Sequence, residues 1–374
     1  MTVTERRPGH DIPVAPGPRP ARLRAGPLLA ACAVLAGAAL LAVLVGPVRL
    51  DPWAVLVELA GRLPGVDTSS GLSDQEAAIL WQLRLPRVVL GGLVGAMLAL
   101  AGAAYQGVFR NPLADPYLLG AAAGAGLGAT LAIAYGPDTS RSTGAPPWGS
   151  PDPSGWPVDL LPLAAFAGAV AGVVAAYALG RSGPARTTTS LILSGVAVAA
   201  FLTAIQTYVQ QRESETLREV YGWILGRLTT AGWREVVLIV PYALVSTAAI
   251  LLHGRLIDVL AVGDDEASSL GVRAARVRLV VVAAATLATA AAVAVSGLIG
   301  FVGIIVPHTI RLLAGSSHRL LAPLSLVAGA AFLILADLAA RTVMAPAELP
   351  IGVVTAIIGA PFFALVLRGA RRVP

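Results

Sequence analysis

Residues 83–120 read LRLPRVVLGGLVGAMLALAGAAYQGVFRNPLADPYLLG, and this stretch decides the fold class. An apolar run of small residues, about twenty long, is enough to cross a membrane. Arg84 and Arg87 flank Pro86 where the first helix of the stretch is expected to begin. A polar connector with two prolines, residues 110–116, cannot remain plain helix, and the chain then becomes apolar again. The stretch therefore predicts two membrane helices joined by a short loop.

Composition extends this prediction to the whole chain. Of 374 residues, 56% are hydrophobic and only 13% are charged, whereas soluble domains carry about 25% charged residues. Each membrane span needs roughly 20 apolar residues, and the chain holds about ten such stretches. Their approximate centres are Val34, Ala99, Gly126, Gly168, Ala199, Val245, Thr289, Ile305, Leu333 and Ile358. Forty glycines suit helices that approach one another closely in lipid. The sequence predicts an all-α integral membrane protein with about ten transmembrane helices.

Both termini are expected in the cytoplasm. Residues 1–27 are rich in Pro and Arg without apolar periodicity, and we interpret them as a disordered tail ahead of a transmembrane domain at residues 28–370. The run from Leu28 to Val45 is too long for a signal-peptide core and lacks a good cleavage site, so it is interpreted as an uncleaved helix. With ten spans, a cytoplasmic N-terminus places most of the 27 arginines inside, as the positive-inside rule requires.

The motif LPR, ahead of a Gly/Ala-rich span that ends in NPLADP, resembles the membrane permeases of the iron-siderophore, haem and cobalamin importers. This FecCD or BtuC-like family belongs to the type II ABC importers. Two later segments resemble the same family, SGLIGFVGIIVPH at residues 296–308 and ELPIGVVTAIIGAP at residues 348–361. The resemblance implies an inverted repeat that relates spans two to five with spans seven to ten. It also implies a second permease copy or close paralogue, separate ATPase subunits and an extracytoplasmic substrate-binding protein.

The chain is not expected to hydrolyse ATP itself. A phosphate-cradling loop needs its lysine, and the sequence contains no lysine. ATP and Mg are therefore expected on a partner ATPase, and we expect no cofactor, catalytic residue or metal site in this chain. Membrane lipid is an expected partner and nucleic acid is not. The single cysteine, Cys32, excludes an intrachain disulfide and a cysteine-based metal cluster.

The segment between the sixth and seventh spans is the expected attachment point for the ATPase. In the family, a Gly-Glu-x-Ala-x-x-Leu-Gly pattern forms short coupling helices, and the segment here is similar to it. An acidic trio would stand at a helix start, where the helix dipole favours negative charge. An ordinary solvated loop is the alternative. The coupling prediction comprises Gly263, Asp264, Asp265, Glu266, Ala267, Leu270 and Gly271.

Arg84 and Arg87 fall on the outer side, where the charge rule predicts few arginines. The resemblance implies that these residues, with Arg341, meet glutamates of the binding protein. Exposed pairs of this kind contribute only about 0.2 to 1 kcal/mol each, so they would set register and association rate more than affinity. The alternatives are snorkelling toward headgroups and, for Arg341, a local ion pair with Asp337 one turn earlier.

Polar residues within apolar spans are candidates for the pathway lining, because such groups usually face the bundle interior. The candidates are Gln106, Thr203, Gln206, Thr207 and Tyr208. His308 has no second ligand at metal-binding spacing, and we interpret it as structural. Asp337 is an intramembrane carboxylate, interpreted first as packing and capping chemistry. Residues 210–233 combine charge with aromatics and predict a short interfacial helix, and residues 137–157 predict an outer loop.

The function expected from these features is ATP-driven import of a ferric siderophore by alternating access. The resemblance also covers importers of haem and cobalamin, so these two remain alternative cargoes. An ion-coupled secondary transporter is the competing class, and it would need paired intramembrane carboxylates. Asp337 is the one clear candidate for such a carboxylate in the sequence.

Overall fold

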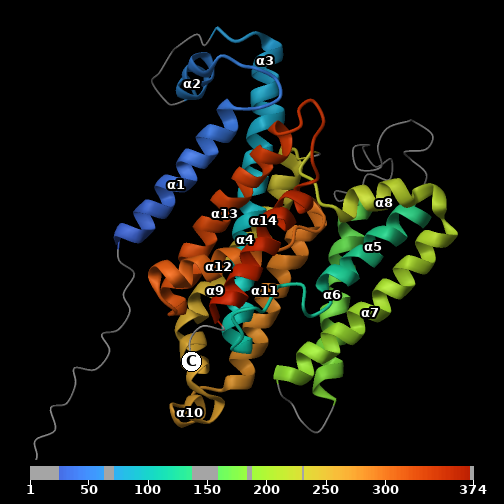
Figure 1. Ribbon diagram of the computed structural model, residues 1–374, viewed down its shortest axis with the longest axis vertical. Coiled ribbons are helices and arrows are strands. Elements are labelled where there is room, and N and C mark those ends of the chain that lie inside the picture. Colours follow the sequence, from blue (N-terminus) through green and yellow to red (C-terminus); the bar gives the residue numbers. More distant parts are fainter. Residues whose placement is uncertain (1–24, 63–70, 137–158, 183–187, 230, 371–374) are drawn as a thin grey trace, which may run out of the picture.

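A computed structural model describes residues 25–62, 71–136, 159–182, 188–229 and 231–370, and in these ranges it contains only helices and their connections (Figure 1). The predicted outer loop at residues 137–157 and residues 1–24 of the predicted tail lie outside them. The helices are α1 (Ala25–Leu44), α2 (Pro52–Ala60), α3 (Asp74–Ala78), η1 (Ile79–Arg84), α4 (Leu85–Phe109), α5 (Ala121–Tyr135), α6 (Leu160–Arg181), α7 (Thr188–Arg212), η2 (Ser214–Thr216), α8 (Leu217–Ile224), α9 (Trp233–Val262), α10 (Asp264–Ser269), α11 (Ala274–Ser296), α12 (Val302–Ala314), α13 (His318–Thr342) and α14 (Ile351–Ala370).

Each of the ten predicted apolar stretches falls within one of these helices. Seven helical segments, which include α1, α4, α6, α7, α9, α11 and α13, are long and apolar enough to cross a membrane. The apolar parts of α5, α12 and α14 are shorter, between 10 and 17 residues. The predicted all-α membrane architecture is confirmed. A short helix is present within residues 210–233 as expected, as η2 followed by α8, and its position at the membrane interface stays a prediction.

Helix α4 lies at the centre of the bundle, where it packs on α13, α11, α9 and α12. Figure 1 shows α1 along one edge and the group α5 to α8 along the other. Helices α2 and α3 stand at one end of the long axis, and α10 stands at the opposite end. We call these the α3 end and the α10 end. The two ends of the bundle are therefore separated by the long apolar helices.

Glycines on α4 allow its neighbours to approach at backbone distance. A Cβ added to Gly95 would lie 2.2 Å from the carbonyl oxygen of Gly329 on α13. A Cβ added to Gly102 would lie 2.0 Å from the carbonyl oxygen of Gly303 on α12. Lipid supplies no hydrophobic drive between helices, so close van der Waals packing must hold them together.

In both halves of the chain a long helix is followed by a bend and then by a short helix. Helix α4 ends with Arg110 in the left-handed region at φ 52°, and a non-helical connector leads to α5. Helix α11 ends at Ser296, and Phe301, also left-handed at φ 69°, precedes α12. The Tyr117 hydroxyl joins the two bends, because it donates to the carbonyl of Ile299 and accepts from its N–H, both at 3.1 Å. The matching bends are what an internal repeat predicts.

The helix that contains α4 begins earlier than the sequence suggested. Instead of starting at Pro86, it runs back to Asp74, where Ser73 and Glu76 form a reciprocal capping box. Proline cannot donate a hydrogen bond and clashes with the preceding turn. The segment η1 before Pro86 accommodates this with wider π-type turns. The prolonged helix projects beyond the bundle at the α3 end (Figure 1).

Gly102→Ala tests the α4–α12 contact. The added methyl group would overlap the main chain of Gly303, and overpacking of this kind costs about 1–3 kcal/mol. We expect a lower thermal unfolding midpoint for the purified protein in detergent. Gly37→Ala is the matched control, because no atom lies within 4 Å of a Cβ at this helical position. Equal midpoints for the two variants would contradict the assignment.

Candidate functional site

Arg84 lies at the α3 end and is only 4% exposed. Its guanidinium donates to the carbonyl oxygens of Val43 at 2.9 Å and Leu44 at 3.3 Å, and also to that of Val48. The last carbonyls of a helix lack partners within the helix. Arg84 therefore caps the C-terminal end of α1.

Arg87 connects two carboxylates. It donates to Asp337 of α13 at 2.8–3.0 Å and to Glu348 at 3.0 Å. The Arg87 side chain is 13% exposed and that of Asp337 is 4% exposed, whereas that of Glu348 is 28% exposed. The group links α4 to α13 and to the segment that precedes α14.

Arg341 completes this cluster and is 2% exposed. It donates to the carbonyl oxygen of Ala42 on α1 and forms an ion pair with Asp337 at 3.6 Å. The local ion pair considered from the sequence is thus present. Since Asp337 is engaged by two arginines, it is not a free carboxylate for a coupling ion.

The expectation that the outer arginines are exposed is wrong. Arg84 and Arg341 are buried, and Arg87 is largely covered. The physical reason is that the carbonyls at the end of α1 and the buried carboxylate of Asp337 all require donors. Docking of a binding protein by these residues stays a prediction.

At the opposite end, the predicted coupling segment contains the short helix α10. All three acidic residues lie in its first turn, as expected, with Asp265 and Glu266 exposed. Ala267 is fully buried and anchors the helix. Gly263 precedes the helix with φ 156°, and Gly271 follows with φ 77°. Two apolar side chains beside α10 face outward, since Val262 is 72% and Leu270 is 69% exposed.

Asp264 fixes α10 to the bundle. Its carboxylate forms ion pairs with Arg278 of α11, at 3.1 Å, and with Arg110 at the end of α4. Arg110 also donates to the carbonyl oxygen of Leu260 on α9 at 2.7 Å. A displacement of α10 would therefore be transmitted directly to the ends of three long helices.

Gln106 lies at the crossing of α4 and α12. Its amide nitrogen donates to the carbonyl of Gly303 at 3.0 Å, and its amide oxygen accepts from Arg311 at 2.7 Å. Two of the three segments that carry the family resemblance thus meet at one buried glutamine, which is 3% exposed.

The other four candidates for the pathway lie on α7, which packs on α5 and α6. Gln206 is buried, whereas Thr203, Thr207 and Tyr208 are exposed. The Thr207 hydroxyl donates to the carbonyl of Thr203 at 2.9 Å. The structure therefore separates the predicted pathway residues into Gln106 at the α4–α12 crossing and four residues of α7, three of them on its exposed side.

His308 lies on α12 with its ring edge-on to Phe362, at a centroid distance of 5.8 Å. In the described part of the chain, no group of three or more His, Cys, Asp or Glu residues could hold a metal ion. A packing role for His308 stays our prediction.

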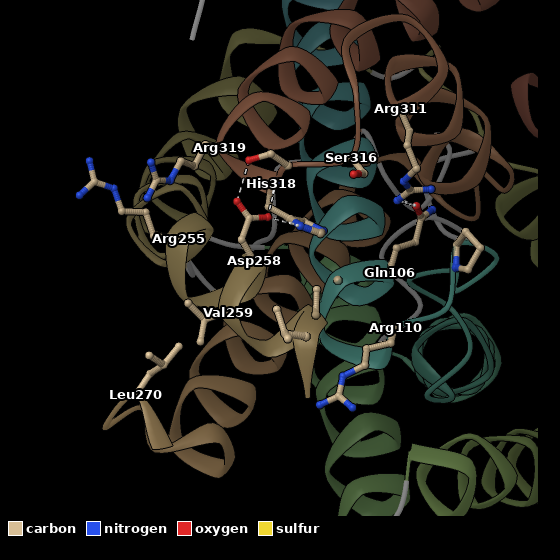
Figure 2. A pocket seen from close by; sticks show the side chains of 15 residues that line it. Gln106, Arg110, Arg255, Asp258, Val259, Leu270, Arg311, Ser316, His318 and Arg319 are labelled. Carbon is tan, nitrogen blue, oxygen red and sulfur yellow. Dashed lines mark hydrogen bonds and ion pairs between the residues drawn. The ribbon is translucent and has the colours of Figure 1, made fainter. Parts of the chain in front are cut away.

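A cavity of about 760 Å³ opens at the α10 end, between the ends of α4, α9 and α12 and the start of α13 (Figure 2). Asp258 of α9 accepts hydrogen bonds there from the Ser317 hydroxyl at 2.7 Å, the His318 N–H at 2.6 Å and the His318 ring at 2.9 Å. It thereby caps the first turn of α13 from another helix. The sequence does not reveal this group, because its partners are about 60 residues apart and follow no periodic pattern.

The family model for the FecCD transport family matches residues 33–369. The chain belongs to the FecCD transport family. Its relatives include an uncharacterized ABC transporter permease protein of Bacillus subtilis, YvrB, 41% identical over 78% of this chain and 80% of the relative. The cobalamin import permease BtuC of Halobacterium salinarum is 39% identical over 85% of this chain and 79% of the relative. The Fe(3+) dicitrate transport permease FecD of Escherichia coli is 35% identical over 89% of this chain and 95% of the relative.

A solved inward-facing structure assigned to a metal-chelate type ABC transporter has the same fold as this FecCD permease. It superposes with a TM-score of 0.76 at 27% identity, over 92% of this chain and all of that chain. The protein is therefore a multi-pass ABC permease, a transport subunit rather than a catalytic one.

The substitutions Asp337→Asn and Glu348→Gln test separately the buried ion pair of Arg87 with Asp337 and its partly exposed ion pair with Glu348. Removing one partner of a buried ion pair leaves an uncompensated charge, which costs about 3–5 kcal/mol. A partly exposed pair contributes about 0–1 kcal/mol. We expect Asp337→Asn to lower the thermal midpoint of the FecCD permease in detergent much more than Glu348→Gln. The reverse order would refute this assignment of the cluster.

Proposed function

We propose that this permease carries a ferric siderophore across the bacterial cytoplasmic (inner) membrane by alternating access, with both termini in the cytoplasm. The observation that carries the proposal is the family match over residues 33–369. Among the relatives, an Fe(3+)-citrate permease and an iron(3+)-hydroxamate permease of Bacillus subtilis are 35% and 36% identical over 87% and 79% of this chain. Transport of an iron complex is thus a property of several similar chains.

Cobalamin is the second candidate cargo. The Halobacterium salinarum cobalamin permease is 39% identical, above the two iron permeases just named. Haem is the third, from the hemin permease of Yersinia pestis, which is 37% identical over 77% of this chain. All three cargoes are large and shielded, and none requires a metal site in the permease.

Uptake by cells tests the cargo. We expect cells without this gene to lose uptake of radiolabelled iron supplied as a ferric siderophore, and to regain it on complementation. Radiolabelled cobalamin and haem, supplied in parallel, serve as controls. Loss of cobalamin or haem uptake with unchanged iron uptake would overturn the iron proposal and leave an importer of the same family.

The partner ATPase, which would bind ATP and Mg, is proposed to dock on α10. The exposed side chains of Val262 and Leu270, at the two ends of α10, offer apolar surface beside its acidic first turn. The ion pairs of Asp264 with Arg110 and Arg278 connect this surface to α4 and α11. Movement of the ATPase subunits would thereby reach the helices that close the pathway.

Leu270→Ser tests this docking surface. An apolar side chain of this size contributes about 1.5–3 kcal/mol when buried in an interface. We expect at least a tenfold weaker association with the ATPase, which corresponds to about 1.4 kcal/mol. A pull-down and substrate-stimulated ATP hydrolysis by the reconstituted complex measure it. Ser269→Ala, at the neighbouring exposed position, is the control. Normal association of Leu270→Ser would reject α10 as the docking site.

The substrate-binding protein is proposed to dock on the α3 end. Of the three outer arginines, Arg87 is the best placed for direct contact, because its partner Glu348 is partly exposed. Arg84 and Arg341 would act indirectly by holding α1 in place. Charge reversal at Arg84 or Arg341 would also disturb α1. A substitution at Glu348 would therefore report on docking more directly.

A second permease copy, or a close paralogue, is proposed to cover the exposed side of α7 that carries Thr203, Thr207 and Tyr208. Polar side chains rarely face lipid within the hydrocarbon region. Thr203, Thr207 and Tyr208 are nevertheless exposed on this apolar helix, and Tyr208 is 62% exposed. A water-filled pathway between two copies would place these side chains in a polar environment.

A further inference from the structure

Helix α2 is amphipathic in the reverse sense to a helix that lies against water. Its exposed residues are all apolar, namely Pro52, Trp53 and Leu56, and Trp53 is 72% exposed. A helix on the surface of a soluble domain turns charged and polar residues outward. A cluster of exposed apolar side chains instead marks a surface that contacts a partner or a membrane.

The one ionisable residue of α2 is directed toward the protein. Glu58 is half-buried, and its carboxylate accepts a hydrogen bond from the indole N–H of Trp81 at 3.0 Å. The guanidinium of Arg62, just after α2, lies 4.9 Å from the centre of the Trp81 ring, where cation–π attraction is favourable. These contacts hold the carboxylate of α2 on its inner side and leave apolar side chains on its outer side.

The level of α2 relative to the membrane follows from α1. Helix α1 has 20 residues, so it is about 30 Å long, which is the thickness of the hydrocarbon core. Leu44, at the end of α1, therefore lies at a membrane boundary. Val55 of α2 belongs to the same buried apolar cluster as Val43 of α1 and Leu80 of η1. Helix α2 thus lies at this boundary rather than far beyond it.

The lipid-facing surface of α1 continues into α2. The connection between the two helices exposes Val45 and Val48. Figure 1 shows α1 and α2 along the same edge of the bundle, opposite the group α5 to α8. A second permease copy on α7 would lie at that other edge, so it would not cover α2. Lipid is the occupant that this continuity favours.

A second tryptophan is exposed at the same end of the bundle. Trp233, at the start of α9, is 45% exposed, and its indole N–H donates to the carbonyl of Trp81 at 2.8 Å. Tryptophan is enriched at membrane–water interfaces because its ring is apolar while its N–H needs a polar partner. Trp53 and Trp233 therefore both have the environment expected of an interfacial tryptophan.

We propose that α2 lies in the headgroup region of the lipid bilayer, with Trp53 and Leu56 directed between lipid molecules. Interfacial amphipathic helices bury their apolar face about 5–10 Å into the boundary between headgroups and acyl chains. Because the carboxylate of α2 is bound internally, the contact requires no particular headgroup charge. The proposal rests on the proposed function only for sidedness, since a cytoplasmic N-terminus places α2 in the outer leaflet.

Spin labels on single cysteines test the position of α2. Cys32→Ala removes the native cysteine, and a new cysteine is introduced by Leu56→Cys in α2 or by Gln75→Cys in α3. Gln75 is the control position, because it is exposed on the helix that projects beyond the bundle. In phosphatidylcholine liposomes, electron paramagnetic resonance measures collisions of each label with oxygen, which dissolves in hydrocarbon, and with a water-soluble nickel chelate. We expect the label at position 56 to favour oxygen and the label at position 75 to favour nickel.

Two other results would overturn the proposal. A preference for nickel at position 56 would show that α2 faces water. Protection of position 56 from both reagents would show that a protein, such as a second copy or a docked subunit, covers the helix. Either result would leave the proposed function intact, because the measurement involves neither cargo nor ATPase.

A serine substitution tests Trp53 as the anchor. Trp53→Ser, added to the protein labelled at position 56, should abolish its preference for oxygen. Leu29→Ser is the matched control, because Leu29 is an apolar residue, 67% exposed, at the other end of α1. Equal thermal midpoints of the two variants in detergent would show that both fold. Equal oxygen preferences in the two variants would reject Trp53 as the anchor of α2.

Discussion

The structure depends on how closely other helices can approach α4. Inside a membrane, association gains nothing from the hydrophobic effect, so attraction comes from atoms in contact and from hydrogen bonds. Gly95 and Gly102 remove the side chains that would separate α4 from α13 and α12. The close approach of α4 and α12 brings the carbonyl of Gly303 within reach of Gln106. The side-chain amide of Gln106 donates a hydrogen bond to this carbonyl. Close packing and polar recognition are therefore achieved at the same place.

Polar interactions take over where the helices end. At the α3 end, three arginines satisfy the terminal carbonyls of α1 and neutralise Asp337. At the α10 end, Asp258 caps α13 and Asp264 fixes α10. Unsatisfied backbone groups are costly at a membrane boundary, and Arg84, Arg341 and Asp258 bind such groups at the ends of α1 and α13.

Much of the fold could be predicted from the sequence, because membrane spans follow from length and apolarity alone. All ten apolar stretches correspond to helices, and the acidic start of α10 was recognised from its residue pattern. The environment of Arg84 could not be predicted, since its partners are the main-chain carbonyls of a helix about 40 residues earlier. The bond between Asp258 and His318 was missed for a similar reason. The five pathway candidates were predicted on two different spans, but the bonds of Gln106 to Gly303 and Arg311 required the three-dimensional packing.

The bond between Arg341 and Ala42 has a consequence for how the protein is made. These residues are 299 positions apart, so the end of α1 lacks this donor until α13 has been synthesised. Until then α1 is held only by its few contacts with η1 and α4, which include the bonds from Arg84 to Val43 and Leu44, and most of its surface faces lipid. Its uniformly apolar surface suits that period of isolation, and its final attachment becomes one of the last steps of assembly.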